Sequence, residues 1–194
     1  MMRKADVERK TKETQISLRL VLDGKGGCRA ETGVGFLDHM LDLLARHGGF
    51  DLTVKAKGDL HVDDHHLVED VGIVFGQALK KALGKKEGIA RYGSATVPMD
   101  ESLVMCALDL GGRPYLDYGL TLPAKRIKKF ETELMEEFYR AVVNAAGMNV
   151  HLRQLAGRNT HHIIEASLKA FARALGQAAS PSGRGGVPST KGVL

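Results

Sequence analysis

The chain contains the stretch His65-His66-Leu67-Val68-Glu69 and repeats its pattern at His161-His162-Ile163-Ile164-Glu165, 96 positions later in a sequence of 194 residues. Each copy opens a segment with apolar residues at helical spacing, so each is predicted to begin a helix. On a helix the first His and the Glu share one face, and the second His points about 100° away. Two such helices would offer imidazole and carboxylate ligands for two cations.

The sequence around each copy repeats as well. An amphipathic helix is predicted upstream of each, over Phe36–His47 before Gly48-Gly49 and over Thr132–Ala146 before Gly147. Alternating strands follow each helix, and each half opens with a strand-like stretch, at Gln15–Leu22 and Ser102–Leu110. The sequence therefore predicts two strand-strand-helix-strand-helix units of the α+β class.

These units define two pseudo-symmetric repeats, each expected to form a mostly antiparallel sheet covered by helices. The predicted boundary lies near Gly88, giving residues 1–88 and 89–194 as parts of one compact unit. The segment Ser180–Gly186 has the composition of a linker, so it is either a disordered end or, on the resemblance described below, an ordered substrate-binding tail.

Composition restricts the function classes. The chain has 43% hydrophobic and 26% charged residues. None of its apolar runs approaches the roughly 20 residues that a membrane helix needs. The polar start lacks a secretory signal, and Cys28 and Cys106 form no close-spaced pair, so reduced thiols and a cytoplasmic location are expected. The net charge of +5 is dispersed and aromatics are few, which favours a small anionic substrate over nucleic acid.

The repeated His and Glu residues are typical ligands of Mn, Fe, Co or Zn, and the lack of thiolate argues against a closed structural zinc site. The duplication adds one candidate ligand to each half: His39, on the predicted first helix, corresponds to Glu137, 98 positions later. The alternatives are that His39 is a helix-surface residue and Glu137 an ordinary solvated carboxylate. We expect one ion to be held by His65, Glu69, His162 and Glu137, and the other by His66, His161, Glu165 and His39.

Five motifs resemble imidazoleglycerol-phosphate dehydratase, in the right order and over almost the whole chain: Gly35-Phe36-Leu37-Asp38-His39-Met40-Leu41, Asp64-His65-His66-x-x-Glu69-Asp70, Pro98-Met99-Asp100-Glu101, Asn159-Thr160-His161-His162-x-x-Glu165-Ala166 and Pro188-Ser189-Thr190-Lys191-Gly192. The resemblance implies a duplicated α+β fold of the ribosomal S5 domain 2-like type. It also implies two Mn²⁺ ions per active site, and trimers assembled into a homo-oligomer of 24 subunits with sites between subunits.

The resemblance further implies roles for individual residues. The metal ligands would be His39, His65, His66, Glu69, His161, His162 and Glu165, with Glu137 at a position where many members have His. Glu13 resembles the acid/base residue, and Glu69 and Glu165 join it as catalytic carboxylates. The family's phosphate-binding positions correspond in this chain to Arg91, Arg113, Lys169, Ser189 and Lys191.

The reaction implied is the loss of water from imidazole-glycerol phosphate to give imidazole-acetol phosphate, in histidine biosynthesis. Cations on the ring nitrogens would favour the imidazolate, which expels the hydroxyl through a diazafulvene-like intermediate while Glu13 removes or relays a proton. One rival function is a two-metal phosphohydrolase, which usually relies on several Asp ligands. Another is a non-catalytic metal carrier or RNA-binding module that uses the positive charge.

Overall fold

A computed structural model describes residues 2–183 and 185–192. The first half contains β1 (Lys4–Lys10), β2 (Thr14–Val21), β3 (Cys28–Glu31), α1 (Gly35–Gly48), β4 (Asp51–Gly58) and α2 (His65–Leu83). The second half contains β5 (Tyr92–Met99), β6 (Ser102–Asp109), β7 (Tyr115–Gly119), the short strands β8 (Arg126–Ile127) and β9 (Phe130–Glu131), α3 (Leu134–Ala146), β10 (Asn149–Ala156) and α4 (Thr160–Ala179).

The two halves have the same topology. The first four-stranded sheet has the order β1-β2-β4-β3 and the second the order β5-β6-β10-β7. In each sheet the last pair is parallel, β3 with β4 and β7 with β10, and the other pairs are antiparallel. The predicted α+β fold of two repeats with mostly antiparallel sheets is confirmed.

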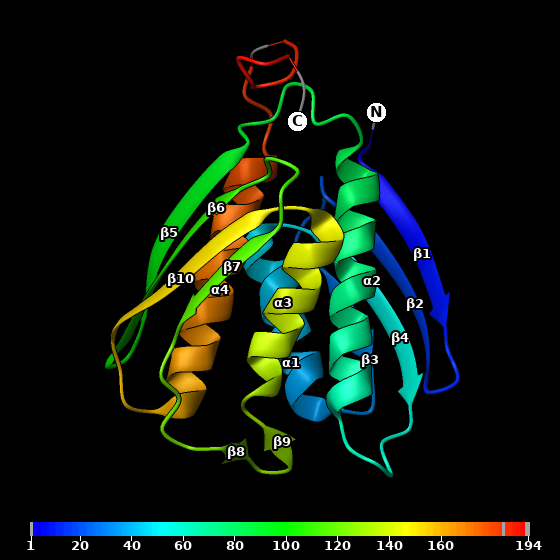
Figure 1. Ribbon diagram of the computed structural model, residues 1–194, viewed down its shortest axis with the longest axis vertical. Coiled ribbons are helices and arrows are strands. Elements are labelled where there is room, and N and C mark those ends of the chain that lie inside the picture. Colours follow the sequence, from blue (N-terminus) through cyan, green and yellow to red (C-terminus); the bar gives the residue numbers. More distant parts are fainter. Residues whose placement is uncertain (1, 184, 193–194) are drawn as a thin grey trace.

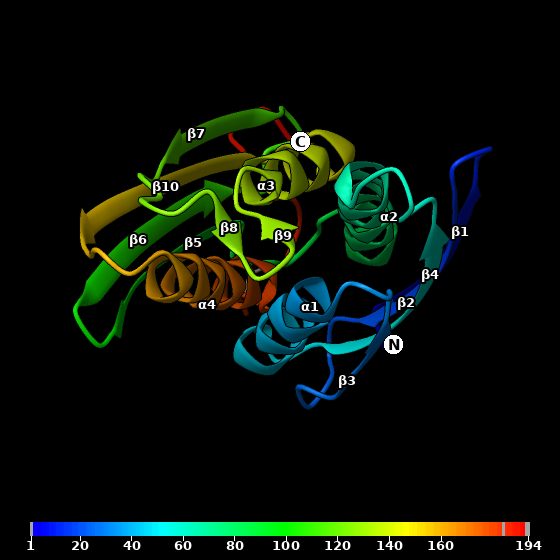
Figure 2. The same ribbon diagram turned by 90° about the horizontal axis from the view of Figure 1, so that it is seen from below.

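The helices lie between the two sheets, as Figure 2 shows from the end of the molecule. Helix α1 of the first repeat packs on α4 of the second, and α2 of the first packs on α3 of the second. Large side chains from all four helices are fully buried there, among them Leu41, Phe75, Phe138 and Phe171. The two repeats therefore share one hydrophobic core.

Two glycines permit the close approach of α2 to α3. A Cβ at Gly72 would lie 2.8 Å from the carbonyl oxygen of Phe138, and one at Gly76 would lie 2.7 Å from the carbonyl oxygen of Val142. Because Gly72 and Gly76 are four residues apart, they lie on the same face of α2. That face can reach the backbone of α3 only without side chains at these two positions.

The helices begin at one end of the molecule, the lower end in Figure 1. Helices α1 and α3 each end at a glycine in the left-handed conformation, Gly49 with φ 73° and Gly147 with φ 66°, as the predicted stop signals require. The described tail lies at the opposite end (Figure 1). Its backbone is held against the α2–β5 connection, where Gly88 N donates to Gly186 O and Ala90 N donates to Ser180 O.

The structure corrects one element of the predicted repeat. Three strands of each four-stranded sheet, rather than two, precede the first helix of the repeat, and the second repeat adds the short pair β8 and β9. Strand β1 reads KADVERK, and only Ala5 in it is fully buried, because β1 lies at the edge of its sheet with one face in solvent. Charged edge strands of this kind carry little apolar alternation. No helix in the described part of the chain is long and apolar enough to span a membrane.

Candidate metal centre

Two imidazoles and a carboxylate converge where the N-terminal ends of α1 and α4 meet. His161 Nε2 lies 3.1 Å from Glu165 Oε2, and His39 Nε2 lies 3.7 Å from the same oxygen. One ligand atom from each of the three residues lies within 4.8 Å of the others. Within residues 2–183 and 185–192 this is the only cluster of three or more His, Cys, Asp or Glu side chains with such spacing.

The local structure at the start of α4 sets this geometry. Asn159 is the N-cap, and its side-chain oxygen accepts from the backbone N–H groups of His161 (2.9 Å) and His162 (3.3 Å). The helical spacing then places His161 and Glu165 one turn apart on the same face. Packing of α1 on α4 brings in His39, and the Phe36 ring meets His161 edge-on with centroids 5.5 Å apart.

Glu165 is the most buried ligand of the cluster, with 10% of its side chain exposed. Burial opposes its charge, but the hydrogen bond and charge of Lys169, then those of His161 and His39, hold its pKa below the usual range. Lys169 Nζ donates to Glu165 Oε1 at 2.7 Å, one helical turn farther along. Glu165 is therefore an ionised carboxylate with one oxygen on Lys169 and the other facing the two imidazoles.

A cavity of about 700 Å³ opens beside His39 and His161. Its wall comes from the starts of α1, α2 and α4 and from β8 and β9: Gly33–Phe36, His39, Asp64, 127–130 and His161. This size suits a small metabolite.

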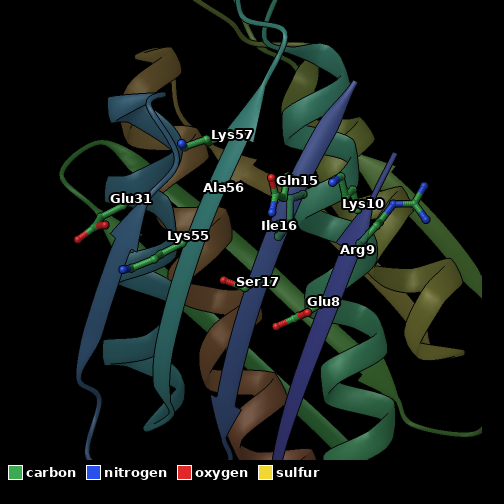
Figure 3. Close-up of a pocket in the computed structure, with 10 residues that line it drawn as sticks. All are labelled: Glu8, Arg9, Lys10, Gln15, Ile16, Ser17, Glu31, Lys55, Ala56 and Lys57. Carbon is green, nitrogen blue, oxygen red and sulfur yellow. The ribbon is translucent and has the colours of Figure 1, made fainter. Parts of the chain in front are cut away.

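A second hollow, of about 650 Å³, lies on the outer face of the first sheet, where Figure 3 shows side chains from neighbouring strands. It is lined by charged residues such as Arg9, Lys55 and Glu31 and contains none of the predicted site residues. The cavity beside the two imidazoles is therefore the candidate site.

The other predicted metal ligands lie outside this cluster within a single chain. His65, His66 and Glu69 are at the start of α2, and Glu137 is in the first turn of α3. His162 points to a different side of α4 from His161, and the two ring planes are at 89°. The structure thus brings together three of the four residues assigned to one ion, His39, His161 and Glu165, and leaves His66 elsewhere.

The predicted phosphate-binding residues divide between the two ends of the molecule. Lys169 contacts the cluster, whereas Arg91 N bonds to Ala178 O near the far end of α4, roughly 25 Å from His161 at about 1.5 Å per helical residue. Arg91 makes a bidentate pair with Asp109 and also donates to the Pro188 carbonyl oxygen, which anchors the tail that carries Ser189 and Lys191. Arg113 is exposed after β6.

Glu13, the predicted acid/base residue, is exposed in the turn between β1 and β2. It lines a shallow depression together with Asp59, which hydrogen-bonds His66 Nδ1 at 3.0 Å. Glu13 is therefore near a predicted ligand of the first repeat, and away from the His39–His161–Glu165 cluster on α1 and α4.

Two carboxylates at predicted ligands were not identified as site residues from the sequence. Asp59 contacts His66, and Glu101 contacts His162 Nδ1 at 2.8 Å. Glu101 belongs to one of the motifs behind the family resemblance, but no role was assigned to it. No periodic pattern marks either residue, because both lie in connections whose paths depend on the tertiary fold.

Comparison with known proteins gives a consistent result. Residues 32–175 match the family model described as imidazoleglycerol-phosphate dehydratase. Proteins of that name from Desulforamulus reducens and Moorella thermoacetica are 60% and 58% identical to this chain. The alignments cover 99% of this chain and 98% of the first relative, and 100% of both chains for the second.

Solved structures agree with the sequence matches. The crystal structure of imidazoleglycerol-phosphate dehydratase from Staphylococcus aureus superposes with a TM-score of 0.84 at 42% identity, covering 92% of this chain and 99% of that one. A crystal structure of IGPD from Pyrococcus furiosus in complex with (S)-C348 gives 0.85 at 36% identity, covering 97% and 100%. By sequence and by structure, the chain belongs to the imidazoleglycerol-phosphate dehydratase family and is a hydro-lyase.

Proposed function

We propose that this enzyme dehydrates imidazole-glycerol phosphate to imidazole-acetol phosphate in histidine biosynthesis, with two Mn²⁺ ions at each active site. The observation that carries the proposal is the convergence of His39, His161 and Glu165 beside a cavity of metabolite size, in a member of this family. The cluster draws on both repeats, since His39 is on α1 and the other two residues are on α4.

The cluster fits a divalent cation by its chemistry. Two imidazoles and an ionised carboxylate are a ligand set that suits Mn²⁺. His66 is the proposed fourth ligand, and the second ion would be held by His65, Glu69, His162 and Glu137. When bound, cations at these ligands would lower the pKa of the substrate's ring N–H and so favour the imidazolate.

The chain's own carboxylates would manage the proton transfers. Glu13 is exposed, near His66, and free to meet a substrate, so we assign it the removal or relay of the proton from the carbon next to the one that loses hydroxyl. Glu69 and Glu165 act as ligand carboxylates. Hydroxyl loss would precede proton loss, through a diazafulvene-like intermediate of the substrate.

The phosphate group would serve as a handle that orients the substrate. Arg113, Lys169, Ser189 and Lys191 are the proposed contacts, together with Arg91 once its pairing with Asp109 is shared or exchanged. Because Arg91 and His161 are roughly 25 Å apart within one chain, one small substrate cannot reach both in the same copy. This separation supports sites formed between copies, as in the proposed 24-subunit assembly of trimers.

The direct test uses protein stripped of metal with a chelator, then supplied with Mn²⁺ and imidazole-glycerol phosphate. We expect ketone and no free phosphate, both measured by mass spectrometry, and loss of turnover in the stripped sample. His39→Ala should abolish turnover, whereas His151→Asn, a change of a histidine on β10 away from the cluster, should preserve it.

Other outcomes identify the rival functions. Release of inorganic phosphate in place of the ketone would establish a phosphohydrolase. Absence of turnover together with tight, salt-dependent RNA binding would establish a binding module. Turnover that is unaffected by exhaustive chelation would refute the metal-dependent part of the proposal.

A further inference from the structure

The second histidine of each His-His-x-x-Glu motif has a carboxylate on the same ring nitrogen. In the second repeat, His162 Nδ1 lies 2.8 Å from Glu101 Oε2. In the first repeat, His66 Nδ1 lies 3.0 Å from Asp59 Oδ2. The two histidines therefore have matching surroundings, although neither belongs to the cluster formed by the first histidine of the second motif.

This contact decides which ring nitrogen is available to a metal. An ionised carboxylate only accepts hydrogen bonds, so the proton of the neutral imidazole must be on Nδ1. The lone pair is then on Nε2, which faces away from the carboxylate. Near His162 Nε2, the Asp100 carboxylate is 3.7 Å away, beyond hydrogen-bond distance, and 73% of the Asp100 side chain is exposed.

We propose that Glu101 is a positioning residue, which holds His162 in the tautomer and orientation that present Nε2 to a divalent cation, and that Asp59 does the same for His66. The inference rests on the proposed function, because it concerns the metal-binding role of these histidines. Carboxylates that hydrogen-bond the distal nitrogen of a ligating imidazole are a recurrent means of fixing the ring and raising its basicity.

Glu101 is itself held firmly. Its Oε1 atom accepts from Ser102 Oγ (3.1 Å) and from the backbone N–H groups of Arg158 (3.2 Å) and Asn159 (2.8 Å). The hydrogen bond with His162, followed by the one with Asn159, holds the pKa of Glu101 far below its ordinary value. Glu101 therefore ties the turn between β5 and β6 to the N-cap of α4 with one oxygen and meets His162 with the other.

The two repeats supply these carboxylates from different places. Glu101 directly precedes β6, and its counterpart directly preceding β2 is Glu13. Asp59 directly follows β4, and its counterpart directly following β10 is Gly157.

Gly157 cannot take over the role of Asp59. Its φ is 134°, and an added Cβ would lie 2.5 Å from Ser102 Oγ. In the first repeat Asp59 pairs with His66, and the Glu13 carboxylate has no hydrogen-bond partner among the residues that the structure describes. In the second repeat no side chain fits at Gly157, and Glu101 pairs with His162. The glutamate at this turn position therefore contacts a histidine in the second repeat, as Glu101, and does not do so in the first, as Glu13.

The sharpest test is Glu101→Gln. The amide oxygen can still accept from Ser102 and from the two backbone N–H groups, but the amide nitrogen that faces His162 Nδ1 must donate. The imidazole proton would then move to Nε2, where it blocks the cation. We expect Mn²⁺ to bind about 10- to 100-fold more weakly to one of the two sites per chain, with the unfolding temperature of the metal-free protein nearly unchanged.

The measurements are Mn²⁺ titrations of the full-length, assembled, metal-stripped protein, by calorimetry and by electron paramagnetic resonance of free Mn²⁺. Glu101→Asp, which restores a carboxylate, should recover part of the lost affinity, and Asp59→Asn should weaken one site to a similar degree. Asp117→Asn is the matched control, because Asp117 pairs in the same way with His151 (3.3 Å), a histidine outside the proposed ligands. It should leave both affinities unchanged.

Equal Mn²⁺ affinity in wild type, Glu101→Gln and Asp59→Asn would overturn the positioning role while leaving the proposed function intact. A lower unfolding temperature of metal-free Glu101→Gln with unchanged affinity would likewise reduce Glu101 to a residue that anchors the loop. Failure of the wild-type protein to bind Mn²⁺ would overturn both proposals, and it is distinguished by the wild-type titration alone.

Discussion

One buried hydrogen bond joins α3 to α4, the helix that carries His161, Glu165 and Lys169, and either partner can be truncated to test it. Tyr139 on α3 and Ser167 on α4 are both fully buried, with Tyr139 Oη 2.9 Å from Ser167 Oγ. Ser167 Oγ also donates to the Ile164 carbonyl oxygen at 2.7 Å. Because that bond uses the serine proton, Tyr139 must be the donor between the two hydroxyls.

The two truncations should therefore differ. Ser167→Ala leaves a buried tyrosine hydroxyl without an acceptor, which costs about 1–3 kcal/mol, slightly offset by the better helix propensity of alanine. Tyr139→Phe removes the donor while Ser167 keeps its bond to Ile164, so its cost should be about 0.5–1.5 kcal/mol. The double variant should cost less than the sum, because no unpaired hydroxyl remains.

Tyr118→Phe is a matched control from a ring whose centroid is 6.0 Å from that of Tyr139. The buried Tyr118 hydroxyl has no hydrogen-bond partner within the described part of the chain. Removing it should leave stability unchanged or raise it.

The assay is thermal unfolding by circular dichroism, at one protein concentration and with the assembly state verified for each variant. At about 2–4 °C per kcal/mol for a chain of this length, Ser167→Ala should unfold several degrees below wild type and Tyr139→Phe less far below. A larger loss in Tyr139→Phe than in Ser167→Ala, or an equal loss in Tyr118→Phe, would refute the reasoning.

Three further predictions concern packing, a thiol and a surface ion pair. Gly76→Ala should destabilise the protein by about 1–3 kcal/mol, because the new Cβ would lie 2.7 Å from a backbone oxygen of α3. Gly35→Ala is the control: no atom lies within 4 Å of its new Cβ, so the unfolding temperature should change little. Burial raises the pKa of Cys28 from 9.0 to about 11, so its thiolate fraction at pH 8 should be about 100-fold below that of an unshifted thiol. Because a thiolate of higher pKa is a better nucleophile, its reaction with a disulfide reagent should be slower by about 10-fold, and labelling as fast as that of an unshifted thiol would contradict this. The hydrogen bond from Arg3 lowers the pKa of Asp23, so this carboxylate stabilises the fold above about pH 4, and the stabilisation is lost as pH falls through the lower folded pKa. Unfolding temperatures measured from pH 3 to 7 should fall less steeply in Asp23→Asn, by an amount worth under about 1 kcal/mol because the pair is partly exposed.

Much of the fold could be predicted because its signals are local. The glycines after α1 and α3, the apolar spacing within the helices and the alternation in β2 and β4 each depend on near neighbours in sequence. Strands β1 and β5 at the sheet edges carried no comparable signal, since their inner-facing positions are mostly only partly buried and include small or charged residues such as Ala5, Arg9 and Gly93.

The site was predictable only in part for the same reason. His39, His161 and Glu165 were found because the motif repeats, and the chain then brings them together. The contact between Glu101 and His162 joins the turn between β5 and β6 to the start of α4, 61 positions later. A contact between segments so far apart in the sequence leaves no local pattern that could predict it. The remaining predicted ligands, at the starts of α2 and α3, lie apart from this cluster in one chain, and local sequence patterns carry no information on contacts between chains.

The contact of α1 with α4 and that of α2 with α3 are the same contact made twice, once in each direction across the repeats. Two separate half-length chains could form this arrangement as a symmetric pair, in which every mutation would act at both places at once. Covalent joining of the halves removes that constraint. It allows Glu13 and Glu101, or His39 and Glu137, to diverge independently, so that a symmetric scaffold can support a site whose two sides do different work.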